Sequence, residues 1–288
     1  MTVYIIENDK PHLLYKIFNV FKLENIENKT IIRIPINSRS LKFRIEQNAK
    51  KLSEFLYNND VRNIVLSKEL MKMEEFKNIL YSNNINILDG TRLSRYLTYE
   101  IILKILKYKT IKIETAEITI LVNNNDNVNI ENIIRIGKKV KRLNILTNNV
   151  KAFKKIVDYL YEEVGILVKL TNNININLKN TDVILNIDFP EELINKIELP
   201  LYSTIISIPY NVDINLKKFS GINIKAWDII TPSEYKLSGF EDRIIYESII
   251  YNKDIENIYK KIKEDNIKII NLRGKNGIIN RKEFARNL

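Results

Sequence analysis

The sequence predicts an α/β protein of two lobes, each built around a parallel β-sheet, with a C-terminal helical extension. Short continuous apolar runs alternate along the chain with longer stretches whose apolar residues recur at helical spacing. The runs are typical of strands buried on both faces of a sheet, and the stretches are typical of amphipathic helices. Short connections between them indicate parallel strands joined by helices. The pattern restarts near residues 110–116, which predicts the second lobe.

The first lobe is expected to be an α/β domain that covers residues 1–112. Its predicted strands are four apolar runs, at residues 3–6, 31–36, 63–66 and 85–88. The helices between them are expected to begin at polar N-cap residues, which are Ser38 or Ser40, Ser67 and Thr91. One more helix is expected around residues 13–21, after the first strand.

The second lobe is expected to cover residues 113–238 and repeats the same alternation. Its predicted strands lie at residues 117–122, 143–147, 166–170, 182–187 and 204–208. One helix is predicted over residues 129–142, and another from an N-cap at Asn149 to Val164. Gly165 follows the second helix, where helices commonly end in a left-handed glycine.

The extension is expected to cover residues 239–288. The segment from Ser238 to Glu241 has the spacing of a capping box and opens a long helical stretch that continues to Ile262. An apolar run at 267–272, a turn at 274–277 and the apolar pair 278–279 follow. These predict a short β-hairpin at the end of the chain.

The composition excludes several classes of site. The 288-residue chain has no cysteine and one histidine, His12, so disulfides, thiolate chemistry and a multi-histidine metal site are excluded. No apolar run approaches the roughly 20 residues that span a bilayer, and the first residues do not form a signal peptide. We expect a cytoplasmic protein without a metal or a membrane partner.

The formal charge of +11 would ordinarily suggest a polyanionic partner. Isoleucine, asparagine and lysine are over-used, however, while glycine (7) and proline (6) are scarce, which is typical of an AT-rich bacterial genome. The basic charge is therefore expected to reflect genome composition more than a dedicated nucleic-acid partner.

One group of basic residues has regular spacing. Arg135, Lys138, Lys139 and Arg142 fall at i, i+3, i+4 and i+7, which would place them on one face of the helix predicted over 129–142. Such a face could bind phosphates. The ordinary alternative is that it is the solvated face of an amphipathic helix.

Three segments of the second lobe resemble parts of a known domain: residues 139–147, 148–153 and 178–187. They resemble the Rossmann dinucleotide-binding domain, in the form found in shikimate dehydrogenases and glutamyl-tRNA reductases. The resemblance covers about a third of the chain. It implies an NADP-dependent oxidoreductase, with the cofactor bound where the first two strands of the lobe end.

The chain departs from that domain at the residues that matter most. The glycines that let the backbone approach a pyrophosphate are replaced at 123–129 by a glycine-free segment that contains Asn123, Asn125 and Asp126. At the end of the second predicted strand, Thr147 and the two asparagines after it replace the acidic residue that usually binds the ribose hydroxyls. Lys151 lies near enough to reach a 2′-phosphate. These five residues are the candidate contacts for a cofactor, beside a phosphate loop that has lost its glycines.

The sequence therefore favours a non-catalytic or regulatory protein that uses no cofactor and keeps the scaffold for interaction with a protein partner or a second copy. It shows no convergent set of catalytic residues. Two alternatives stay open. One is an NADP-dependent oxidoreductase of the kind that the resemblance implies, and the other is a polyanion-binding protein that uses the face around Arg135.

Overall fold

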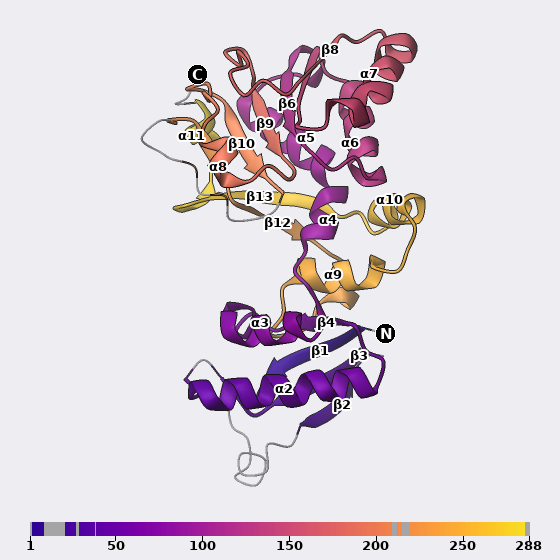
Figure 1. The fold of residues 1–288 in the computed structure, drawn as a ribbon, viewed down its shortest axis with the longest axis vertical. Coiled ribbons are helices and arrows are strands. Elements are labelled where there is room, and N and C mark those ends of the chain that lie inside the picture. Colours follow the sequence, from indigo (N-terminus) through magenta and orange to yellow (C-terminus); the bar gives the residue numbers. More distant parts are fainter. Residues whose placement is uncertain are drawn as a thin grey trace. The chain divides into compact units, whose positions relative to one another are not determined.

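The computed structural model describes residues 2–8, 21–26, 29–37, 39–208, 212, 214 and 219–285. The predicted α/β class is confirmed. The chain divides into two compact units, each formed from two stretches of sequence (Figure 1): Met1–Gly90 with Thr231–Asp254, and Thr91–Ile230 with Ile255–Leu288. His12 and most of the helix expected around 13–21 lie outside the described residues.

The first unit contains a five-stranded sheet in the order β2-β3-β1-β4-β5. Its strands are β1 (Thr2–Glu7), β2 (Lys22–Ile26), β3 (Lys29–Ile34), β4 (Asn63–Leu66) and β5 (Asn86–Leu88). Four of them are parallel, as predicted, and β2 pairs antiparallel with β3 at one edge. The sequence analysis missed β2, which is mostly exposed.

Helices from distant parts of the chain cover the two faces of this sheet. The first face packs against α2 (Lys42–Asn58) and α3 (Glu74–Ser82), which follows the 3-10 turn η1 (Leu70–Lys72). The second face, which includes Tyr4 and Val65, packs against Phe240 and α9 (Asp242–Ile250). A parallel sheet has to be buried on both faces, so the segment 231–254 completes the unit.

The second unit contains a six-stranded sheet whose strands are all parallel. They are β6 (Glu117–Leu121), β7 (Arg142–Leu146), β8 (Val168–Thr171), β9 (Val183–Asn186), β10 (Thr204–Ser207) and β11 (Ile222–Ile224). Their order across the sheet is β11-β10-β9-β6-β7-β8. Numbered within the sheet and read from β8, this is 3-2-1-4-5-6, the strand order of the Rossmann fold. The predicted Rossmann-like fold is confirmed, with β11 as a strand that the sequence analysis missed.

The remaining elements of this unit are helices and a small antiparallel sheet. The helices are α4 (Thr91–Tyr96), α5 (Thr98–Lys109), α6 (Asn127–Gly137), α7 (Val150–Val164), α8 (Glu191–Ile194), α10 (Ile255–Glu264) and α11 (Arg281–Ala285). The small sheet comprises β12 (Ala226–Ile230), β13 (Lys268–Gly274) and β14 (Gly277–Ile279). The hairpin of β13 and β14 confirms the predicted one. Gly165 ends α7 in the left-handed conformation, with φ of 75°.

Two predicted helices have different bounds in the structure. Helix α6 ends at Gly137 instead of residue 142, because Arg142 is the first residue of β7 and pairs with Glu117 of β6. The backbone N–H groups of Lys141 and Arg142 donate to the carbonyl of Ala116, which excludes helical hydrogen bonds there. The long helix expected to continue to Ile262 is two helices, α9 and α10, separated by residues 251–254.

The two units also differ from the predicted segments 1–112, 113–238 and 239–288. Helices α4 and α5 belong to the second unit, and residues 231–254 belong to the first. The predicted segments are consecutive along the chain, whereas each unit is assembled from separated stretches. Among the described residues, no helix is both long enough and apolar enough to cross a bilayer.

Candidate functional site

The candidate site lies at the carboxyl ends of β6 and β9, which are neighbours in the centre of the Rossmann-like sheet. Leu121 pairs with Asn186 at these ends, and the strand order reverses between the two strands. Rossmann folds bind dinucleotides in the crevice at this switch point. The predicted residues Asn123, Asn125 and Asp126 follow β6, and Thr147 directly follows β7.

Asp188, which follows β9, binds the backbone of the loop after β6. Its carboxylate accepts hydrogen bonds of 2.6 Å from the backbone N–H groups of Asn123 and Asn124, one on each oxygen. Backbone N–H groups at this position are the ones that a dinucleotide would need for its phosphates. Here they already hold an anion that belongs to the protein.

A second carboxylate occupies the start of α6. Asp126 is the N-cap of this helix and accepts hydrogen bonds of 3.1 Å from the N–H groups of Val128 and Asn129. The guanidinium of Arg95, at the end of α4, donates to the Asp126 carboxylate and, at 2.9 Å, to the side-chain oxygen of Asn129. The helix N-terminus thus binds an internal carboxylate that an arginine neutralises.

The residues present do not fit a dinucleotide bound in the usual Rossmann mode. The loop has no glycine, so side chains occupy the space that the backbone would need to approach a pyrophosphate. Its N–H groups bind the carboxylates of Asp126 and Asp188 instead. A bound pyrophosphate would have to displace both carboxylates and then lie beside their negative charges.

The predicted contacts after β7 join the same network in part. The Thr147 hydroxyl is buried and accepts a hydrogen bond of 3.0 Å from the N–H of Asn149. The side-chain oxygen of Asn123 accepts a hydrogen bond of 2.8 Å from the N–H of Asn148, which connects the loops after β6 and β7. Asn125 and Lys151 are exposed.

The four residues of the predicted basic face do not share one helix. Because α6 ends at Gly137, only Arg135 of the four residues lies on the helix. Arg142 lies on β7 and pairs with Glu117 at 3.6 Å, while Lys138 and Lys139 are exposed in the turn between the two elements. Anion binding by these residues stays a prediction, now limited mainly to the two lysines.

Arg135 is held by the protein itself. Its guanidinium donates to Glu100 at 2.9 Å and lies over the rings of Tyr99 and Tyr259, at 4.8 and 4.7 Å from their centroids. Burial raises the pKa of Tyr259 to about 12, although hydrogen bonding to Arg135 and its positive charge oppose this increase. Arg135 therefore joins α5, α6 and α10 within the unit.

The sequence analysis missed the two residues that define the site, Arg95 and Asp188. Their positions offered one signal, which is that Asp188 lies two residues after the end of a buried strand of the sheet. Among the described residues, no group of three or more potential metal ligands comes together.

No family model matches this sequence, and no curated protein is similar to it. Solved structures with a similar architecture include a shikimate dehydrogenase in complex with NADP⁺, at 11% identity and a TM-score of 0.35, with 91% of this chain and 94% of that chain covered. L-tryptophan dehydrogenase from Nostoc punctiforme matches at 9% identity and a TM-score of 0.35, covering 91% and 77%. Ornithine transcarbamoylase from Giardia lamblia matches at 10% identity and a TM-score of 0.34, covering 88% and 86%. The Rossmann-like assignment rests on the strand order of the six-stranded sheet, which the chain itself supplies.

Proposed function

We propose that this is a non-catalytic or regulatory protein that keeps a Rossmann-like scaffold for interaction and does not bind NAD or NADP at the switch point. One observation supports this proposal above the others. The N–H groups of the loop after β6 and of the first turn of α6 are bound by the protein's own carboxylates, Asp188 and Asp126.

The energetic argument concerns the charge of the ligand. Two like charges about 4 Å apart repel by roughly 4 kcal/mol at an effective dielectric constant of about 20. A pyrophosphate would meet such repulsion at Asp188, and would also need the hydrogen bonds that the carboxylates of Asp126 and Asp188 now accept. The repulsion from Asp126 is smaller, because the Arg95 guanidinium donates to that carboxylate.

The test is a titration of the protein with NADPH and with NADH, followed by calorimetry and by the fluorescence of Trp227, the single tryptophan. We expect no saturable binding up to about 1 mM, which corresponds to a binding free energy weaker than about −4 kcal/mol. Micromolar binding of either coenzyme would overturn the proposal and favour the NADP-dependent oxidoreductase.

A matched variant tests the reason for the expected result. Asp126→Asn combined with Asp188→Asn keeps one oxygen acceptor at each position, and asparagine is as good an N-cap as aspartate. If the two charges form the barrier, the double variant binds NADPH more tightly than the wild type does. If neither protein binds NADPH, the side chains of the glycine-free loop prevent binding, and the two charges are not the reason.

The partner of the scaffold is part of the proposal. The simplest partner is a second copy of the chain, and light scattering over a range of protein concentrations measures whether a dimer forms. A monomer at all concentrations would direct the search to a different protein.

A further inference from the structure

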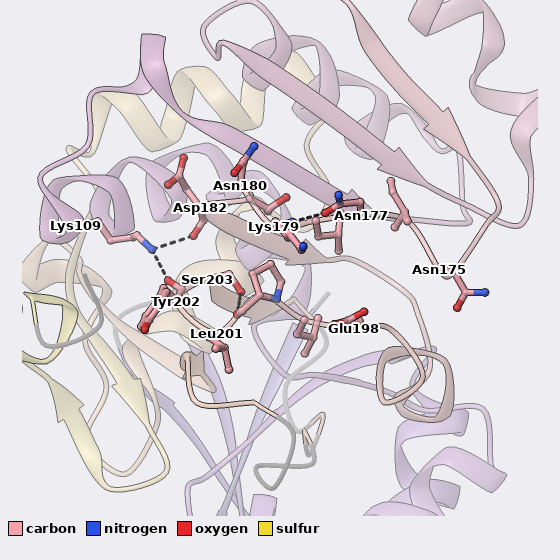
Figure 2. A pocket seen from close by; sticks show the side chains of 15 residues that line it. Lys109, Asn175, Asn177, Lys179, Asn180, Asp182, Glu198, Leu201, Tyr202 and Ser203 are labelled. Carbon is pink, nitrogen blue, oxygen red and sulfur yellow. Dashed lines mark hydrogen bonds between the residues drawn. The ribbon is translucent and has the colours of Figure 1, made fainter.

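A cavity of about 810 Å³ opens beside the amino ends of β9 and β10 (Figure 2), at the opposite end of these strands from the candidate site. Its walls are the segment 175–182 before β9, the segment 198–203 before β10, and Lys109, the last residue of α5. All of these residues belong to the second unit. The volume lies within the range of small-molecule sites, which is about 300–1,000 Å³.

Lys109 is the unusual residue of this cavity, because the residue is 5% exposed although it carries an ammonium group. Its Nζ donates hydrogen bonds to the backbone carbonyls of Tyr202, at 2.9 Å, and Asp182, at 3.3 Å (Figure 2). An ammonium has three N–H donors, so one remains beyond these two bonds. Both acceptors are neutral carbonyls, so neither hydrogen bond brings a negative charge to the ammonium.

The nearby acid does not supply the counter-ion. In the parts of the chain that the structure describes, no carboxylate oxygen lies within 4.0 Å of Lys109 Nζ. The Asp182 carboxylate instead accepts a hydrogen bond of 2.9 Å from the backbone N–H of Glu117. Burial lowers the pKa of Lys109, and the negative charge of Asp182 only partly opposes this effect. Buried lysines are rare without a partner, because removing an ammonium from water is costly.

We propose that this cavity binds a small organic anion whose carboxylate or phosphate group lies against Lys109 Nζ as its counter-ion. The proposal goes beyond the proposed function, which concerns the opposite end of the strands, and either one can fail alone.

The other walls are compatible with such a ligand. Lys179 adds a second positive charge, and the amides of Asn177 and Asn180 can donate hydrogen bonds to anionic oxygens. Leu201 offers an apolar contact for the body of the molecule. The cavity also has one acid with an exposed carboxylate, Glu198, and Figure 2 shows it on the opposite side from Lys109.

A purely structural role for Lys109 is the competing explanation, since its ammonium connects two loops through their carbonyls. The experiment therefore measures anion binding directly. Thermal unfolding and calorimetry of the full chain are followed with sodium phosphate and with sodium succinate, against sodium chloride at the same ionic strength. We expect at least one of the two anions to raise the unfolding temperature saturably.

Variants assign that binding to the site. Lys109→Met should weaken the affinity roughly tenfold or more, since it removes a charged hydrogen-bond donor. Lys109→Arg retains the charge and should retain part of the binding. Lys107→Met, an exposed lysine on the same helix, is the matched control and should bind like the wild type.

Two results would overturn the proposal. One is the absence of saturable stabilisation of the wild type by either anion, and the other is equal binding by Lys109→Met and the wild type. Stabilisation by phosphate alone assigns the ligand to phosphorylated compounds, and stabilisation by succinate alone assigns it to carboxylates.

If Lys109→Met does not fold, the wild type still gives the answer. The ¹³Cε and ¹⁵Nζ resonances of Lys109, assigned by their loss in Lys109→Arg, should shift on addition of the anion that stabilises the protein. The pKa of the Lys109 amine should rise at the same time, because a bound anion favours the charged form. A Lys109 resonance that does not move while the protein is stabilised would also refute the site.

Discussion

The carboxylate of Asp188 accepts a 2.6 Å hydrogen bond from the backbone N–H of Asn123, although the two residues are 65 positions apart in the chain. With the second bond from Asn124, it connects the loop after β6 to the end of β9. The contact places a fixed negative charge where the fold would otherwise offer free N–H groups.

Replacement of Asp188 should therefore destabilise the protein. Asp188→Ala leaves two N–H groups without their acceptor, and we expect the free energy of unfolding to fall by about 1–3 kcal/mol. Asp188→Asn should cost less, since the amide oxygen still accepts one bond. Urea denaturation measures both, with Asp158→Ala, an exposed acid on α7, as the control that should change stability by less than about 0.5 kcal/mol. An effect of Asp188→Ala no larger than that of the control would contradict the role of the contact.

Arg95 and Asp126 should show coupled effects. Arg95→Met removes the donor that neutralises the Asp126 carboxylate, and we expect a loss of about 1–3 kcal/mol in the free energy of unfolding. Once Asp126→Asn has removed the charge, the same arginine substitution should cost less. A double-mutant cycle in urea measures the difference, for which contacting residues typically give about 0.5–3 kcal/mol. Strictly additive effects would show that the ion pair does not stabilise the site.

Tyr259 should make stability depend on pH in the alkaline range. The ordinary tyrosine pKa is 10.0, and burial raises that of Tyr259 to about 12. Between these values the unfolded chain has lost this proton and the folded chain keeps it, so the contribution of the group to stability is present below pH 10 and decreases as the pH rises towards 12.

Tyr259→Phe tests this dependence. Its free energy of unfolding should fall less steeply than that of the wild type between about pH 10 and pH 12. Tyr161→Phe, at a tyrosine that is 60% exposed, is the control and should follow the wild type. Equal slopes for Tyr259→Phe and the wild type would show that the phenol is not protected by the fold.

The charge on the turn after α6 should have no special role in binding polyanions. Arg135 and Arg142 are paired with Glu100 and Glu117, although Arg142 is also exposed, which leaves Lys138 and Lys139 as the exposed charges of the group that form no ion pair among the described residues. We expect Lys138→Glu with Lys139→Glu to lower the salt concentration of elution from heparin no more than Lys154→Glu with Lys155→Glu does, since those two lysines are equally exposed on α7. Complete loss of retention in the first pair alone would favour the polyanion-binding alternative.

The central strands could be predicted because they are buried on both faces. Strands β6, β7, β9 and β10 each begin within one residue of the predicted position, since continuous apolar runs such as 183–185 are typical of strands buried on both faces of a sheet. Strand β11 could not be predicted, because three residues carry too little pattern. It is defined by pairing with β10, where Thr204 is opposite Ile222.

The bounds of α6 show a different limit. The residues after Gly137 are good helix formers, so the local sequence favours a helix to Arg142. Pairing of Arg142 with Glu117 in the sheet ends the helix earlier. The prediction that the four basic residues share one helix was wrong for this reason.

The candidate site was predictable in part. The glycine-free loop is visible in the sequence, and the structure adds that Asp126 is the N-cap of the helix that follows it. The partners of the loop could not be predicted, because Arg95 lies 31 positions from Asp126 and Asp188 lies 65 positions from Asn123. Lys109 resembles any other lysine at a helix end until its burial is known.

The construction of the first unit from two separated stretches has a consequence for the newly made chain. Translation delivers residues 1–90 first, while Phe240 and α9, which cover Tyr4 and Val65, emerge only after most of the second unit has been made. Until then the apolar side chains on one face of the nascent sheet are exposed to water. Chaperones, or transient association with neighbouring polypeptides, would act in that interval.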